Sequence, residues 1–135
     1  MTDNNQQIGI MVVEDESLVS LDISARLRHL GYVVPCTVST GKDAVLKAGE
    51  LKPALVLMDI GLKGDMDGIE AAIQIRARFN IPVIFLTAYG DNKTFESARA
   101  AEPYGYIYKP FDDADLRACV EAALLKVSLE NLSMN

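Results

Sequence analysis

The stretch VLMDIGLKGDMDG, residues 56–68, contains a change from strand to helix on which the predicted fold depends. It begins with an unbroken apolar run and then places one carboxylate, Asp59, directly after it. Short, solidly apolar runs are typical of parallel strands that are covered on both faces. Asp67 and Glu70 then have the spacing of a helix amino-terminal cap. The stretch therefore predicts a strand, a loop and a helix, in that order.

The same alternation extends along the whole chain. Apolar runs of strand length cover residues 8–13, 32–38, 54–58, 81–86 and 105–108. Between and after them lie segments with helical spacing and capping signals, at residues 18–30, 40–52, 67–80, 92–101 and 112–129. The first helical segment has two apolar stripes, of which one holds Leu18, Leu21 and Ala25 and the other holds Val19, Ile23, Leu27 and Leu30.

This alternation predicts an α/β fold of the flavodoxin-like (βα)5 type. Such a fold is a doubly wound, parallel five-stranded sheet of order 2-1-3-4-5 in a three-layer α/β/α arrangement. Pro35 supports this order, because proline cannot donate to a sheet ladder and is confined largely to edge strands. We expect one domain at residues 1–130, followed at residues 131–135 by a C-terminal tail or the start of a linker.

Composition and charge exclude several classes of function. Half of the 135 residues are hydrophobic, so one substantial core is expected. The net charge of −6 argues against a nucleic-acid or anionic-membrane surface. The amino terminus lacks a signal-peptide pattern and no apolar run reaches membrane-spanning length, so we expect a cytoplasmic protein. His29 is the single histidine, and Cys36 and Cys119 have no metal-type spacing.

Charged and polar residues follow four of the predicted strands. They are the acids Glu14–Glu16, then Asp59, Thr87 and Lys109. Ligands of doubly wound sheets bind beyond the carboxyl ends of the strands. Clustered carboxylates raise one another's pKa, and hard oxygen ligands without histidine or thiolate favour Mg²⁺. The residues predict a magnesium site where Asp59 is a nucleophile toward phosphorus, Thr87 donates to a phosphoryl oxygen and Lys109 supplies positive charge.

These residues resemble the receiver domain of two-component response regulators, of the chemotaxis-receiver type, from about Gly9 to Leu125. The motifs that carry the resemblance are VVEDE, LVLMDI, MDGIEA, PVIFLTA and YIYKPF. The resemblance implies a phosphoprotein of a two-component phosphorelay, in which Asp59 accepts a phosphoryl group from the phosphohistidine of a sensor histidine kinase. It also implies a signalling domain that assists its own phosphorylation and dephosphorylation and is otherwise not an enzyme.

The resemblance further assigns roles to individual residues. The implied magnesium ligands are Glu14, Asp15, Asp59 and the backbone carbonyl of Gly61. Thr87 and Lys109 contact the phosphoryl group, and the Lys109–Pro110 bond is often cis in the family. Tyr106 occupies the aromatic switch position, so it would turn inward from a solvent-facing rotamer once Thr87 is drawn toward the phosphoryl group.

The implied partners are a sensor histidine kinase and either a downstream effector protein or a missing output domain. The readout surface is the face made by the fourth helix, the fifth strand and the fifth helix. A homodimer through the fourth-helix face is conceivable, but no residue of the sequence supports it. We expect this chain to contact neither nucleic acid nor membrane.

The loop after Asp59 departs from the family pattern. It lacks the usual proline, and Gly68 is nine residues beyond Asp59 where the family usually has eight. This loop helps to control water access, so the lifetime of the acyl phosphate does not follow from the sequence. Gly61 and Tyr89 occupy the two positions that tune hydrolysis in the family.

Other functions fit parts of the pattern. A flavodoxin needs a glycine- and hydroxyl-rich phosphate cradle after the first strand, where this chain has acids that would repel the phosphate. An aspartate-nucleophile Mg²⁺ phosphohydrolase commonly has a second aspartate two residues after the first, where this chain has Gly61. A phosphorylation-independent interaction module would lack one or more of the site residues. Taken alone, the acids at residues 14–16 would be interpreted as a solvated loop at the start of a helix. The magnesium site is favoured only because these acids, Asp59, Thr87 and Lys109 stand together at four strand ends.

Overall fold

The computed structural model describes residues 8–88 and 96–133. A parallel sheet of five strands in the order β2-β1-β3-β4-β5 forms the middle layer, which confirms the predicted fold class and order. The strands are β1 (Ile10–Val13), β2 (Thr37–Val38), β3 (Leu55–Asp59), β4 (Val83–Ala88) and β5 (Gly105–Lys109). The helices are α1 (Ser17–His29), α2 (Gly41–Leu51), α3 (Gly68–Phe79), the short 3-10 helix η2 (Arg99–Ala101) and α5 (Asp113–Ser133).

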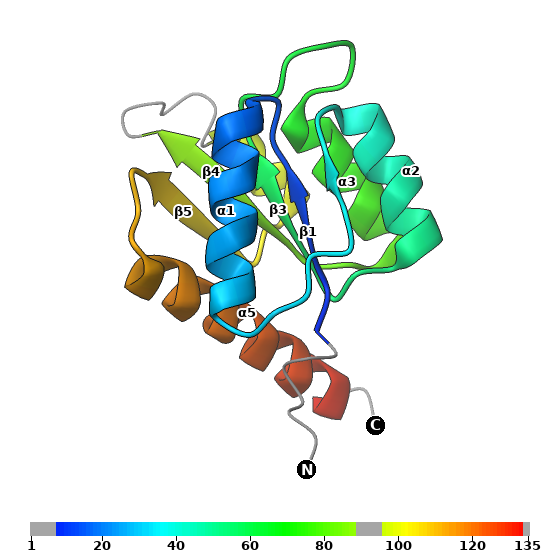
Figure 1. Cartoon of the computed structure of the whole chain (residues 1–135). Coiled ribbons are helices and arrows are strands. Elements are labelled where there is room, and N and C mark those ends of the chain that lie inside the picture. Colours follow the sequence, from blue (N-terminus) through cyan, green and yellow to red (C-terminus); the bar gives the residue numbers. More distant parts are fainter. Residues whose placement is uncertain (1–7, 89–95, 134–135) are drawn as a thin grey trace.

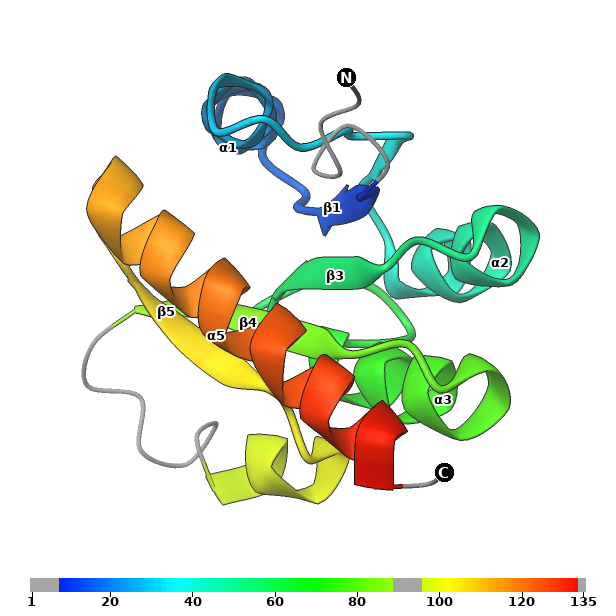
Figure 2. The ribbon, with the colours of Figure 1, turned by 90° about the horizontal axis from the view of Figure 1, so that it is seen from below.

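Helices cover both faces of the sheet, with α1 and α5 on one side and α2 and α3 on the other (Figures 1 and 2). Successive residues of β3 point to opposite faces. Leu55 and Leu57 therefore join the core beneath α1 and α5, while Val56 and Met58 join the core beneath α2 and α3. Burial on both sides is the physical reason for the solidly apolar strands.

Capping side chains mark the starts of two helices, and the one at Asp67 is as predicted. The Thr40 side chain accepts a hydrogen bond from the Asp43 backbone N–H at 3.1 Å before α2. The Asp67 side chain accepts one from the Glu70 N–H at 2.8 Å before α3. Each cap satisfies a backbone donor that has no partner within its helix.

The two stripes of α1 have different surroundings. The helix buries Ile23 and Leu27 against the sheet, together with two serines, Ser20 and Ser24. The Leu18 stripe faces outward, with Leu18 81% and Leu21 66% exposed. A helix on the surface of a sheet presents one face to the core, and here the small serines lie beside the larger residues on that face.

The second strand is much shorter than the predicted residues 32–38. Only Thr37 and Val38 form β2, and an isolated bridge joins Gly9 to Val33. Pro35 lies between these two contacts and has no N–H, so it interrupts the ladder. Its predicted consequence, an edge position for β2, is confirmed. The Lys109–Pro110 peptide bond is cis, as the resemblance implied.

The fifth helix continues to Ser133, four residues beyond the predicted end at Leu129. Its inner face buries Leu116, Val120 and Ala123. Of the predicted fourth helix, residues 92–95 lie outside the described residues, as does Tyr89, while residues 96–98 are helical and lead into η2. No helix within residues 8–88 and 96–133 is long and apolar enough to cross a membrane.

Candidate functional site: an acidic cluster at the carboxyl ends of the strands

Strand pairing brings the predicted site residues to one edge of the sheet. Val13 lies opposite Met58 and Asp59 opposite Leu86. Ala88 lies opposite Lys109 on the neighbouring pair. The ends of β1, β3, β4 and β5 are therefore level with one another, and the residues at or just after these ends share one rim.

Three carboxylates meet at this rim. Glu14, Asp15 and Asp59 each offer an oxygen, and these oxygens all lie within 4.8 Å of one another. The Glu14 side chain is fully buried, whereas the Asp59 side chain is 12% exposed. The Asp15 backbone N–H donates to Oε2 of Glu14 at 3.1 Å. Two neighbouring strands thus hold three negative groups at close range.

Lys109 supplies the positive charge from the end of β5. Its Nζ lies 3.0 Å from Oε1 of Glu14 and 3.8 Å from Oδ1 of Asp59. Burial lowers the pKa of Lys109, but the hydrogen bond to Glu14 and the charge of Asp59 outweigh it, so the pKa lies above its ordinary value. Lys109 is therefore a stable cation between the tips of β1 and β3.

One ammonium does not neutralise three carboxylates. Burial, together with the hydrogen bond and negative charge of Asp59, raises the pKa of Glu14 to about 7, even though Lys109 acts in the opposite direction. This residual repulsion is what a bound cation would relieve. The donors are hard carboxylate oxygens from Glu14, Asp15 and Asp59. The cluster therefore fits Mg²⁺ by charge and by ligand chemistry.

The backbone of the loop after β3 binds two of the acids. The Gly61 N–H donates to Oδ1 of Asp59 at 3.0 Å, and the Lys63 N–H donates to Oδ2 of Asp15 at 3.4 Å. Gly68 closes the loop against the strand, because a Cβ there would collide with the backbone carbonyl oxygen of Asp59. The longer loop thus stays close to the site. The role of the Gly61 carbonyl as a ligand stays a prediction.

A cavity of about 500 Å³ opens beside Asp59. Its lining residues are Asp15, Glu16, Asp59, Ile60, Gly61, Lys63, Thr87, Ala88 and Lys109. The Thr87 hydroxyl is buried at this wall and donates to the backbone carbonyl of Ala88 at 3.3 Å. The cavity brings the predicted acceptor, hydroxyl and amine to one space large enough for a phosphoryl group.

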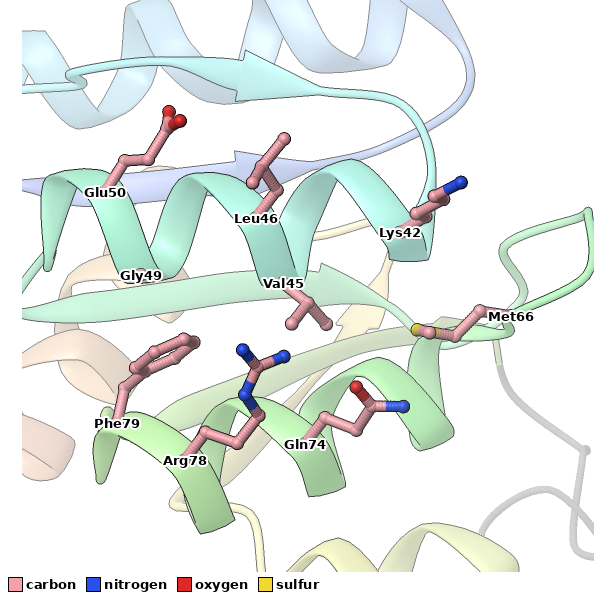
Figure 3. Close-up of a pocket in the computed structure, with 9 residues that line it drawn as sticks. All are labelled: Lys42, Val45, Leu46, Gly49, Glu50, Met66, Gln74, Arg78 and Phe79. Carbon is pink, nitrogen blue, oxygen red and sulfur yellow. The ribbon is translucent and has the colours of Figure 1, made fainter.

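A second cavity of similar size, about 460 Å³, lies between α2 and α3 (Figure 3). Lys42 and Arg78 bring positive charge to its rim and Glu50 brings one negative charge, while Val45 and Phe79 form apolar walls. Within the described part of the chain, the acidic metal-type cluster occurs at the strand ends and not in this groove. The strand-end cavity is therefore the candidate site.

Tyr106, the predicted switch residue, packs on the same face of the sheet as Thr87. Tyr106 pairs with Phe85 across β4 and β5, and Thr87 pairs with Tyr108 two positions further along. Paired residues and those two positions apart share a face. Tyr106 is half-buried, with its ring centroid 6.1 Å from that of Phe85. Thr87 and Tyr106 are thus diagonal neighbours, an arrangement compatible with a coupled movement.

Two features of the site had no signal in the sequence motifs. Lys63 contributes a backbone N–H to Asp15, and every residue except proline carries such a donor. Phe85 contacts the predicted switch residue, and the register of β4 against β5 places it there.

Comparisons with known proteins agree with this arrangement. The family model of the response regulator receiver domain matches residues 10–121. The chain is 36% identical over 115 residues to the transcriptional regulatory protein PdtaR of Mycobacterium tuberculosis, covering 85% of this chain and 56% of that protein. It is 37% identical over 116 residues to the phyllosphere-induced regulator PhyR of Methylorubrum extorquens, covering 85% of this chain and 43% of that protein. The chain thus spans about half the length of these curated relatives.

Solved structures show the same fold. The signal receiver domain of a modulated diguanylate cyclase from Desulfovibrio desulfuricans G20 superposes with a TM-score of 0.86 at 38% identity, covering 90% of this chain and 97% of that chain. The receiver domain of NtrX from Brucella abortus superposes with a TM-score of 0.79 at 29% identity, covering 85% of this chain and 97% of that chain.

Proposed function

From the premise that this chain belongs to the response regulator receiver domain family, we propose that Asp59 accepts a phosphoryl group in a Mg²⁺-dependent reaction. The observation that carries the proposal is the meeting of Glu14, Asp15 and Asp59 with Lys109 beside an open cavity. Receiver domains are signalling domains and not classical enzymes, so we infer single transfer to the chain rather than catalytic turnover.

The four charged residues would divide the chemistry among them. A carboxylate oxygen of Asp59 attacks phosphorus, and the bond to the donor nitrogen or oxygen breaks with its electron pair leaving on the donor. Glu14, Asp15 and Asp59 would hold Mg²⁺, which when bound neutralises charge on the phosphoryl oxygens. Lys109 adds an ammonium 3.8 Å from Oδ1 of Asp59. Such positioning and neutralisation are the main requirements of phosphoryl transfer.

Thr87 and Tyr106 would convert this chemistry into a conformational signal. A phosphoryl oxygen on Asp59 would draw the Thr87 hydroxyl away from the Ala88 carbonyl, and Tyr106 would move into the space on the same face. Moving a two-state equilibrium from 1:99 to 99:1 takes about 5.5 kcal/mol of differential stabilisation. New hydrogen bonds to a charged group contribute roughly 1.5 to 3 kcal/mol each, so two or three are sufficient.

The proposed phosphoryl donor is a sensor histidine kinase in the cytoplasm. The outward stripe of α1 begins directly after the acidic loop, and its Leu18 and Leu21 are large, exposed apolar residues beside the site. Apolar exposure of this kind suits a protein donor that must bring its phosphohistidine to Asp59. The proposed recipient of the signal is a downstream effector protein or an output domain outside residues 1–130.

Mg²⁺-dependent labelling by a small phosphodonor tests the proposal. We expect acetyl phosphate with Mg²⁺ to add one phosphoryl group, detected by intact-protein mass spectrometry, and the addition to be lost when the metal is chelated. Labelling at a site other than Asp59 on peptide mapping would contradict the proposal.

The same experiment separates the alternatives. A phosphorylation-independent interaction module would remain unlabelled. A phosphohydrolase would release inorganic phosphate continuously without accumulating labelled protein. Stoichiometric labelling followed by slow loss of the label is the result expected of a receiver domain.

A further inference from the structure

The groove between α2 and α3 shares no lining residue with the strand-end cavity and takes part in no step of the proposed function (Figure 3). Its volume of about 460 Å³ is within the range of small-molecule sites. The stripe of α2 that lines it spans about two helical turns, or roughly 10 Å. This stripe consists of Lys42, Val45, Leu46 and Gly49.

Apolar side chains bound the groove at both ends. The Phe79 ring lies at one end and packs directly on α2, because a Cβ at Gly49 would lie 2.6 Å from this ring. Met66 lies at the other end beside Lys42, and Val45 lies between the two ends (Figure 3). A peptide that ran along the groove would meet both end walls. The groove therefore favours a short occupant with an apolar body.

The groove carries positive charge that the protein itself does not neutralise. Arg78 extends from α3, and its guanidinium carbon lies 5.1 Å from the centroid of the Phe79 ring. Within the described part of the chain, no carboxylate forms an ion pair with Lys42 or Arg78. The one acid of the lining, Glu50, is paired with Lys47 at 3.2 Å. In a chain of net charge −6, this groove thus complements an anion.

We propose that this groove binds a small aromatic carboxylate. The Arg78 guanidinium presents its N–H donors in a planar fork that matches the two oxygens of a carboxylate. The Gln74 amide lies one helical turn before Arg78 in the same lining and supplies a further N–H donor. The ring of the ligand would rest between Val45 and Met66, since a thioether makes favourable contacts with aromatic rings.

Met66 connects the groove to the acidic site. It belongs to the loop that follows Asp59, and its backbone carbonyl packs so closely on α2 that a Cβ at Gly41 would lie 2.6 Å from the carbonyl oxygen. The same loop donates the Gly61 N–H to Asp59 at 3.0 Å. A ligand that contacts Met66 would therefore favour one position of this loop, and by linkage the position of the loop would alter the affinity for the ligand. Binding itself is independent of whether Asp59 accepts a phosphoryl group.

Nuclear magnetic resonance of the whole chain, titrated with naphthoate as the probe, tests the site. We expect the methyl signals of Met66 and Val45 to move together and to saturate, while those of Leu18 on α1, across the sheet, stay fixed. Naphthamide has the same rings without the charge and should bind about tenfold more weakly, because a charge-assisted hydrogen bond becomes a neutral one. A Met66 signal that does not move at millimolar naphthoate, or equal affinity for the acid and the amide, overturns the proposal.

Removal of one charge tests the role of Arg78. Arg78→Gln should weaken naphthoate binding about tenfold and leave naphthamide binding unchanged. Arg28→Gln, at an arginine of α1 that is exposed like Arg78, is the matched control and should change neither affinity. Thermal unfolding of both variants checks that the domain remains folded. Equal naphthoate affinity of the two variants overturns the assignment of Arg78 as the carboxylate-binding residue.

The Gly61 amide signal tests the link to the acidic site. It should shift with the same midpoint as the Met66 methyl signal, because both residues belong to one loop. The Leu129 amide of α5 is the control and should stay fixed. A Gly61 signal that stays fixed while the Met66 signal moves overturns the link between the groove and the loop.

Discussion

Glu14 and Asp59 stand at the ends of neighbouring strands, yet their surroundings differ. The Glu14 side chain is fully buried and its Oε1 lies 3.0 Å from the Lys109 ammonium. The Asp59 side chain borders the cavity, and its Oδ1 lies 3.8 Å from the same ammonium. Glu14 thus holds the Lys109 ammonium in position, while Asp59 is accessible to a phosphorus atom. The difference between buried partner and open acceptor can be tested by removing each charge in turn.

The largest expected effect comes from Asp59. Asp59→Asn should abolish labelling by acetyl phosphate with Mg²⁺, because the amide cannot act as the nucleophile. Glu14→Gln should retain slow labelling at Asp59, since it removes a proposed metal ligand but leaves the acceptor. Intact-protein mass spectrometry measures both, with Asp65→Asn in the same loop as the control. Unchanged labelling of Asp59→Asn would refute the assignment of the acceptor.

Removal of the shared lysine should affect stability next most strongly. Lys109→Met leaves Glu14 buried without the cation that stabilises its charge. Breaking a buried ion pair in this way costs several kcal/mol, and the partial exposure of Lys109 reduces the expected loss to about 2 kcal/mol. Urea unfolding without Mg²⁺ measures the loss. Lys63→Met, at a lysine lining the same cavity, should change stability little, and equal losses in the two variants would count against the pairing.

Removal of the acceptor charge should have the opposite sign. Burial and, after it, the neighbouring Asp59 raise the pKa of Glu14, so the two carboxylates repel each other in the metal-free protein. Asp59→Asn should therefore raise the free energy of unfolding by about 1 kcal/mol when no divalent ion is present. Added Mg²⁺ should stabilise the wild-type protein and have little effect on the variant, because a ligand that binds the native state raises its stability. Equal metal stabilisation of both proteins would contradict the proposed ligand set.

Thr87 should affect the signal more than the chemistry. Thr87→Ala keeps all three carboxylates and Lys109, so labelling of Asp59 should remain largely intact. Tyr106 should no longer respond, because the hydroxyl proposed to move between the Ala88 carbonyl and the phosphoryl group is gone. Nuclear magnetic resonance of ring-labelled tyrosine, with and without acetyl phosphate, reports this response. Thr37→Ala on β2 is the matched control, and equal loss of labelling and response in Thr87→Ala would contradict the switch.

The sequence predicted those features that depend on local pattern. The apolar runs predicted the five strands, Pro35 indicated that the second strand lies at an edge, and the residues at the strand ends predicted a cluster that the fold brings together. The sequence predicted too much or nothing at all where the outcome depends on neighbours. The extent of β2 depends on how Pro35 interrupts a ladder with β1, and the exposure of Leu18 depends on which face of α1 meets the sheet. The path of the loop after Asp59 depends on backbone donors that no residue type reveals.

The smallest expected effect tests whether the loop after Asp59 is needed to position this acceptor. Asp67→Ala removes the cap on α3 and should lower the free energy of unfolding by about 1 kcal/mol. Thr40→Ala removes the matching cap on α2, outside the loop that follows Asp59, and should cost a similar amount. Labelling should persist in both, because the Gly61 N–H and the pairing of Asp59 with Leu86 hold the acceptor independently of the cap. If Asp67→Ala alone slowed labelling, the loop and not strand β3 would position Asp59. The difference in accessibility between Asp59 and the buried Glu14 would then depend on the geometry of that loop.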